Sequence, residues 1–416
     1  MTVIQAAALL ITLTALLGYV NERFIKLPTP IGVMLTALAL SLGLLIFGTP
    51  EASQWAQTFL DNLNFNSLVM DGLLSFLLFA GALTVNLDDL NEQKWPVLTL
   101  ATVGILLSTF LVGTLTYYAL MLLGLNLPYI YALLFGALIS PTDPIAVLGI
   151  LKKLSVPKRI ETLITGESLF NDGVGVVVFS VLLSFVEEGG GQPSVGSVAL
   201  LFAEEAIGGI LFGLVLGYLT YQLLKRVNNY SVEVLLTLAA VMGGYTLAQI
   251  IHTSGPLAMV VVGLFIGNRG RLFAMSETTR EHLDTFWEMV DEVLNAVLFA
   301  LIGLELLAVR FSELNLAAAF AAVPIALLSR TVSVGGPINL FKFRQDYAPY
   351  TVRMMVWGGL KGGISIALAL SLPEGDERNL IEVMTYGVVV FTILGQGLTV
   401  ERVAKRMIES SKEVEA

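Results

Sequence analysis

Long apolar runs separated by short polar segments extend along the whole chain. Thirteen runs are bounded by charged residues or by Pro and Gly clusters. Several continue for about 20 residues, the length that a helix needs to cross the hydrocarbon core of a bilayer. We expect spans at residues 3–21, 31–48, 67–86, 95–124, 128–151, 160–187, 199–224, 231–251, 256–268, 284–308, 314–336, 350–372 and 380–400. The pattern therefore predicts an all-α polytopic membrane protein with about 13 transmembrane helices.

The composition supports a membrane protein and excludes several other classes. Hydrophobic residues make up 56% of the 416 residues, and charged residues only 13%, against about 25% in soluble domains. The net charge of -10 argues against a nucleic-acid partner. The absence of Cys excludes disulfides and thiolate sites, and two His residues argue against a His-based metal cluster. The first run has no basic segment before it and no cleavage pattern after it, so we interpret it as a span.

Basic residues alternate between the loops. Nearly all Lys and Arg residues lie in the tail or in loops that follow odd-numbered spans, and the opposite loops hold only Arg310 and Arg378. Cytoplasmic loops of membrane proteins carry an excess of Lys and Arg. We therefore expect a cytoplasmic C-terminus and an external N-terminus. The chain lacks long soluble extensions, which suits a prokaryotic inner membrane.

The span at 160–187 begins with polar residues in the stretch GESLFNDGVGVV. Ser168 and Asp172 are four residues apart and share one helix face, and Glu167 and Asn171 share the next. Together these four residues are candidate ligands that offer two carboxylates, a hydroxyl and an amide, and oxygen ligands with negative charge suit a hard cation. The alternative is that both acids are solvated at the membrane interface.

Two other spans are interrupted. Pro141 and Pro144 bracket Thr142 and Asp143 in the span at 128–151. Proline removes a backbone donor and disfavours helix before it, so we expect an unwound segment lining a cavity. A plain kink with a buried, hydrogen-bonded Asp is the alternative.

Lys361 lies between two Gly pairs in the span at 350–372, namely Gly358, Gly359, Gly362 and Gly363. This span is seven spans after the Pro-interrupted one, so the two run in opposite directions. Paired interrupted helices are typical of transporters built from inverted repeats. We expect two inverted six-helix repeats, spans 1–6 and 8–13, joined by span 7. The alternative for the Gly pairs is helix packing, which could hold at the same time.

Two further spans carry charges that bear on the site. Arg330 needs an acidic partner if it is buried, and Glu167 and Asp143 are the candidates; otherwise it extends to an interface. The span at 284–308 begins with four acids on one helix face, where they would form a cytoplasmic funnel that concentrates cations. Those acids are Asp284, Glu288, Asp291 and Glu292. A solvated linker face is the alternative.

The chain resembles the monovalent cation:proton antiporters, most closely the NhaP-type sodium/proton antiporters of bacteria and archaea. The resemblance covers nearly the whole chain. It rests on Arg330 and on the motifs SPTDPIAV, GESLFNDGVGVV, SGPLAMVVVGLFIGN, LFALIGLEL and WGGLKGGISIALALSLP. It implies a homodimer whose protomers hold a dimerisation domain and a core in which two broken helices cross. We expect dimerisation segments at 1–94 and 229–312, core segments at 95–190 and 313–402, a linking span at 191–228 and a short cytoplasmic tail at 403–416.

The resemblance also implies roles for the site residues. Asp172 looks like the carboxylate shared by cation and proton, and Asp143, Ser168 and the Thr142 carbonyl look like further Na⁺ ligands. The family's electroneutral branch is marked by an Asn at the position of Asn171. The family's ion pair beside the site corresponds to Glu167 and Arg330. The family usually has Arg where this chain has Lys361, which leaves the role of that residue open.

The predicted function is secondary active exchange of Na⁺ or Li⁺ for H⁺, without a cofactor and without enzymatic activity. A bare buried carboxylate is costly, so cation and proton would compete for Asp172, with one cation exchanged per proton. Exchange of K⁺ for H⁺ is the closest alternative. A cation channel is a less favoured one, and an intramembrane aspartyl protease using Asp143 and Asp172 lacks any recognisable signature.

Overall fold

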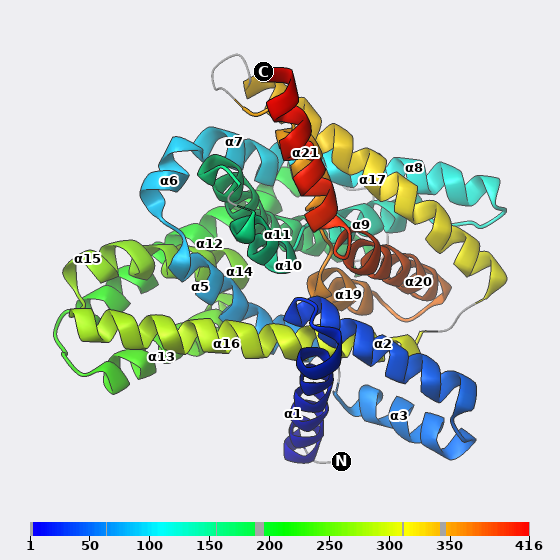
Figure 1. Cartoon of the computed structure of the whole chain (residues 1–416), viewed down its shortest axis with the longest axis horizontal. Coiled ribbons are helices and arrows are strands. Elements are labelled where there is room, and N and C mark those ends of the chain that lie inside the picture. Colours follow the sequence, from blue (N-terminus) through cyan, green and yellow to red (C-terminus); the bar gives the residue numbers. More distant parts are fainter. Residues whose placement is uncertain are drawn as a thin grey trace.

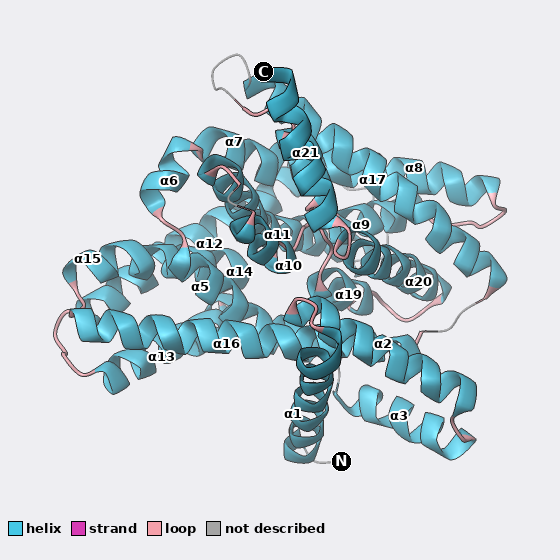
Figure 2. Ribbon diagram, viewed as in Figure 1, coloured by secondary structure: helices cyan, strands magenta, loops and turns pink. Residues whose placement is uncertain are grey.

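The computed structural model describes residues 3–63, 65–154, 156–187, 195–309, 312–341 and 347–415, and Arg310 lies outside them. Within these ranges the regular elements are helices, shown in Figures 1 and 2. The first half forms α1 (Val3–Val20), α2 (Thr29–Phe47), α3 (Pro50–Leu63), α4 (Phe65–Ser67), α5 (Leu74–Thr84), α6 (Leu87–Glu92), α7 (Lys94–Thr99), α8 (Ile105–Leu122), α9 (Tyr129–Ile139), α10 (Ile145–Lys153) and α11 (Lys158–Glu187). The second half forms α12 (Val195–Leu224), α13 (Tyr230–Ile250), α14 (Gly255–Phe265), α15 (Arg271–Phe273), α16 (Glu277–Leu304), α17 (Glu313–Phe341), α18 (Thr351–Trp357), α19 (Gly363–Leu370), α20 (Asp376–Val390) and α21 (Val400–Glu415).

Several helices are extended or joined by short turns of other helical types. The π-helical turns are Asn21–Ile25, Leu68–Leu73, Leu100–Gly104, Ile266–Gly270 and Phe391–Gln396. A 3₁₀ turn at Glu305–Leu307 follows α16 directly. Three of the π-helical turns join two helices into one continuous helical span: α4 with α5, α7 with α8, and α14 with α15.

The prediction of an all-helical membrane protein is confirmed. Ten helices in the described ranges are long and apolar enough to cross a membrane. The other three predicted spans correspond to α9 with α10, to α16, and to α18 with α19. The first and last are each divided into two short helices, and the first half of α16 is acidic. The count of 13 therefore stays a prediction.

The helices pack in two groups that each combine distant parts of the sequence (Figure 1). In one group α14 packs against α5 and α12, and α16 packs against α2. In the other, α8 packs against α9, and α17 packs against α8 and α20. The predicted roles of these parts in dimerisation and transport stay predictions.

Close helix contacts depend on glycine at two positions in particular. A Cβ added at Gly136 of α9 would lie 2.2 Å from the Thr109 carbonyl oxygen of α8. One added at Gly267 would lie 2.2 Å from the Leu83 carbonyl oxygen of α5. Small residues let helix backbones approach closely, which is a main source of helix association within a bilayer.

The C-terminal helix α21 contacts both interrupted passes. It packs against α10 and α18 and buries Val400 and Ala404. Beside it, the Trp357 indole at the end of α18 donates to the Thr399 hydroxyl over 3.1 Å. The predicted tail at 403–416 therefore falls in α21, and the first residues of α21 pack against both interrupted passes.

Candidate functional site

Two breaks in the helices meet at the centre of the molecule. The chain leaves helix between α9 and α10, and again between α18 and α19. The Asp143 amide in the first break donates to the Leu360 carbonyl in the second over 2.9 Å, which forms an isolated antiparallel bridge. Leu360 is buried, so this irregular backbone is enclosed by protein, as backbone at membrane depth must be. The predicted crossing of two broken helices is therefore confirmed.

Asp143 caps the start of α10. Its Oδ1 accepts a hydrogen bond from the Ile145 amide over 2.9 Å, which satisfies one of the free amides that begin any helix. A Cβ added at Gly362 would lie 2.6 Å from Asp143 Oδ2. The glycine therefore lets the second break approach this carboxylate closely.

Two side chains of α11 hold Thr142 in the first break. The Ser168 hydroxyl donates to the Thr142 carbonyl. The Asn171 amide group donates to the Thr142 hydroxyl over 2.9 Å and accepts from the Thr142 amide over 3.3 Å. All three residues are buried. The Asn171 side chain therefore holds the first break in position through Thr142.

Asp172 lies one residue further along α11. It is partly buried and lines the same cavity as Asp143 and Ser168. It lies within electrostatic range of Asp143, Glu167 and Lys361. Among the described residues none forms a hydrogen bond with its carboxylate, so its oxygens face the cavity without a protein donor.

Glu167 and Arg330 form a buried ion pair behind this carboxylate. Arg330 Nη2 is 2.8 Å from Glu167 Oε2, and Nη1 contacts Oε1. Nη2 also donates to the Met355 carbonyl of α18 over 3.4 Å. A Cβ added at Gly359 would lie 2.8 Å from Arg330 Nε, so glycine makes room for the guanidinium. Of the two partners that the sequence offered Arg330, the structure pairs it with Glu167.

Lys361 joins the second break to the end of α9. Its Nζ donates to the carbonyls of Ser140 and Pro141, each over 3.0 Å, and its own amide donates to the Thr392 hydroxyl over 3.1 Å. A cation at a helix C-terminus interacts favourably with the helix dipole and satisfies carbonyls that the break leaves free. Lys361 is buried, with 5% of its surface exposed. Its ammonium group makes these contacts at a position where the resemblance predicts the larger guanidinium of an Arg.

A cavity of about 720 Å³ connects the breaks to the acidic half of α16. Asp143, Ser168 and Asp172 line its inner end. The four predicted funnel acids also line it, namely Asp284, Glu288, Asp291 and Glu292. Lys152 and Arg271 are the basic side chains of this lining, and Arg271 pairs with Asp284. The funnel acids therefore lie on a cavity that leads to Asp172.

Sequence reasoning missed Asn295. Its Nδ2 donates to the Asp291 carbonyl over 2.8 Å, whereas its buried Oδ1 has no partner among the described residues. Asn295 lines the cavity and lies one turn beyond Asp291. The sequence feature that could have identified Asn295 is an isolated polar residue in the apolar half of the span at 284–308.

Comparisons with known proteins agree with this architecture. The family profile described as "Sodium/hydrogen exchanger, transmembrane" matches residues 10–406. The chain is 52% identical over 411 residues to the Na(+)/H(+) antiporter NhaP of Pseudomonas aeruginosa, covering 97% of each chain. It is 35% identical over 390 residues to the Na(+)/H(+) antiporter NhaH of Halobacillus aidingensis, covering 92% of this chain and 93% of the relative. The structure of the sodium proton antiporter MjNhaP1 from Methanocaldococcus jannaschii superposes with a TM-score of 0.76 at 19% identity, covering 98% of this chain and 99% of the other. The chain therefore belongs to the sodium/hydrogen exchanger family.

Proposed function

We propose that this protein exchanges Na⁺ or Li⁺ for H⁺ across the plasma membrane of a prokaryote. The observation that carries the proposal is the position of Asp172, whose carboxylate faces the inner end of an acidic cavity beside two crossed helix breaks. Close relatives named as Na(+)/H(+) antiporters favour Na⁺ over K⁺ as the cation.

Competition for Asp172 would couple the two fluxes. A bare carboxylate is costly to carry past an apolar barrier, whereas the same group neutralised by Na⁺ or by H⁺ crosses at lower cost. Because cation and proton cannot neutralise one carboxylate together, each passage carries one or the other. Alternating access of the site to the two sides of the membrane then gives obligatory exchange.

The surrounding residues would divide the remaining tasks. Asp143, the Ser168 hydroxyl and the Thr142 carbonyl supply oxygen ligands suited to a hard cation. Asn171 holds the broken segment in place through Thr142. Lys361 stabilises the end of α9.

A single exchangeable carboxylate would make the exchange electroneutral. Glu167 is already compensated by Arg330, and Asn171 carries no charge. One Na⁺ would then replace one H⁺ at Asp172, and the charge of the moving part would be the same in both directions.

We further propose a homodimer with a cytoplasmic C-terminus and an external N-terminus. The asymmetry of Lys and Arg between loops supports the orientation. Segments 1–94 and 229–312 would form the dimer, and segments 95–190 and 313–402 would move against them.

Proteoliposomes with a trapped pH dye test the function. Addition of Na⁺ or Li⁺ should dissipate an imposed pH gradient at lower concentrations than K⁺. Asp172→Asn should abolish the signal, and Asp88→Asn, at an exposed acid of α6, should leave it intact. A response to K⁺ alone would show that the cation is wrong, and a fully active Asp172→Asn variant would remove Asp172 from the mechanism.

A further inference from the structure

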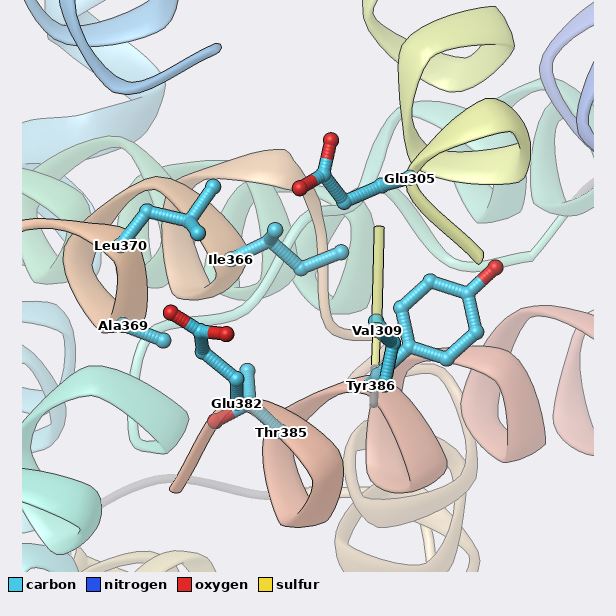
Figure 3. A pocket seen from close by; sticks show the side chains of 8 residues that line it. All are labelled: Glu305, Val309, Ile366, Ala369, Leu370, Glu382, Thr385 and Tyr386. Carbon is cyan, nitrogen blue, oxygen red and sulfur yellow. The ribbon is translucent and has the colours of Figure 1, made fainter. Parts of the chain in front are cut away.

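The hydroxyl of Tyr386 joins the two groups of helices at the end of α16 that lies farthest from the funnel acids (Figure 3). Tyr386 belongs to α20, which packs against α17, and it donates to the Ile302 carbonyl of α16 over 3.1 Å. Tyr386 is 4% exposed, and Ile302 is fully buried. This hydrogen bond therefore crosses the boundary between the two groups inside the protein.

The same hydroxyl takes the place of a hydrogen bond in the helical ladder of α16. The last α-helical bond runs from the Glu305 amide to the Leu301 carbonyl. The next one would join the Leu306 amide to the Ile302 carbonyl, but a 3₁₀ turn begins there instead. The Leu306 amide lies within hydrogen-bonding reach of the Tyr386 hydroxyl. A side chain inserted into the ladder in this way accounts for the change of helix type.

The two backbone groups that meet Tyr386 can pair with each other when the tyrosine leaves. The Leu306 amide would then donate to the Ile302 carbonyl, and α16 would become longer. Buried backbone groups need a partner in nearly all native structures. This end of α16 has one partner available with the tyrosine in place and another without it, so separation of α20 from α16 leaves neither group unpaired.

The contact beside this hydrogen bond is incompletely packed. A cavity of about 10 Å³, near the lower limit for one water molecule, is lined by Tyr386, by Thr385 and by Ala369 of α19. Thr385 is 1% exposed, and its Oγ1 has no hydrogen-bond partner among the described residues. The two groups of helices are therefore held together less tightly here than in a fully packed interior.

We propose that Tyr386 is the gate residue of the far face, the membrane face opposite the wide cavity. Its hydroxyl holds α20 against α16 while the site is open to the wide cavity, and it leaves α16 when the site opens to the far face. This inference rests on the proposed antiport function, because alternating access requires an opening on that side.

Cysteine accessibility tests the gate, because the chain contains no Cys and an introduced thiol is the only target. The reporter is Ala369→Cys, at a residue that is 1% exposed and lines the small cavity. In vesicles that expose the far face, the reporter should react with a membrane-impermeant methanethiosulfonate. Addition of Tyr386→Phe should raise the reaction rate about three- to tenfold, the effect expected for loss of one net hydrogen bond from the closed state.

Tyr245→Phe is the matched control. Tyr245 is also 4% exposed, and its hydroxyl also donates to a main-chain carbonyl, that of Met70, over 2.6 Å. Both of these residues belong to the group of helices that contains α5 and α14, so this bond does not cross the boundary. Tyr245→Phe should therefore leave the reaction rate of the reporter unchanged.

Three results of this experiment would overturn the proposal. Equal rates with Tyr386→Phe and with Tyr245→Phe would show that the Tyr386 hydroxyl does not hold the far face closed. Absence of reaction from the far face in every variant would show that the opening does not pass this contact. An increase from the wide-cavity face alone would place the gate on the wrong side.

Sided transport gives the second measurement. Tyr386→Phe should lower the apparent KM for Na⁺ several-fold at the far face, because the apparent affinity rises with the fraction of molecules open to that face. Tyr245→Phe should not change it. If the wild-type protein does not exchange Na⁺ for H⁺, the proposed function itself fails. If it does and Tyr386→Phe changes neither the reaction rate nor the KM, only the gate fails.

Discussion

The guanidinium of Arg330 contacts both carboxylate oxygens of Glu167, a residue 163 positions earlier in the chain. This fork joins α17 to α11 directly behind the cavity-facing Asp172. Both side chains are almost completely buried, at 9% and 3% exposure. Loss of one partner would leave the other as an uncompensated buried charge.

Arg330→Met and Glu167→Met should each therefore lower the free energy of unfolding by about 3–5 kcal/mol. The double variant should lose clearly less than the worse single variant, because no charge is left unpaired. Thermal unfolding in detergent, followed for all three variants, measures the difference. A double variant as unstable as the worse single one would contradict a stabilising pair.

Lys361→Met should destabilise the crossing of the broken helices. The change leaves the carbonyls of Ser140 and Pro141 without their buried donor, at a cost of about 1–3 kcal/mol for each unsatisfied group. Lys361→Arg, which keeps the charge and donors, should retain most of the stability. Equal unfolding temperatures for wild type and Lys361→Met would show that the lysine does not support the break.

Acidification should raise the apparent KM for Na⁺. If one proton competes with one cation at Asp172, the rise approaches tenfold per pH unit on the acidic side of the titration, and the maximal rate at saturating Na⁺ should change far less. Initial rates of sodium uptake, measured over a series of pH values in buffers of constant ionic strength, give this dependence. A KM that is independent of pH while the maximal rate falls would contradict competition.

Transport should be insensitive to membrane voltage. One Na⁺ or one H⁺ would neutralise Asp172 in each half-cycle, and Glu167 stays compensated by Arg330, so each half-cycle moves the same net charge. Proteoliposomes with a potassium diffusion potential of either sign, set by valinomycin, should show equal initial rates of exchange. Rates that change with the sign of the potential would contradict one-for-one exchange.

The combined change Glu288→Gln and Glu292→Gln should weaken delivery of cations to the site. Both side chains are exposed and line the wide cavity, where negative charge raises the local cation concentration. The apparent KM at that face should rise about two- to fivefold at low ionic strength, with the difference shrinking in high salt as screening sets in. Glu277→Gln, at an exposed acid of the same helix outside the cavity, is the matched control.

Local chemistry made much of this arrangement predictable from the sequence. Pro141 and Pro144 cannot both continue a helix, and paired glycines flank Lys361, so both breaks were expected where they occur. The spacing of Ser168 and Asp172 placed their oxygens on one helix face. The acids of α16 were likewise expected to share one face.

Contacts between segments that are far apart in the sequence could not be predicted from these local patterns. From the sequence, Glu167 and Asp143 were both possible partners for Arg330. The choice of Glu167 depends on how α17 packs against the second break. The hydrogen bonds of Lys361 to Ser140 and Pro141 depend on how the two breaks cross, which no local pattern encodes. Asn171 looked like a candidate ligand, yet its amide is occupied by Thr142.

The bridge between Asp143 and Leu360 joins the two interrupted passes at their breaks. If the two passes move together during transport, the surroundings of Asp172 would keep the same arrangement on both sides of the membrane. The affinity of the site for each ion would then be similar at the two faces, so that one molecule could serve import as readily as export, with the sodium and proton gradients setting the direction.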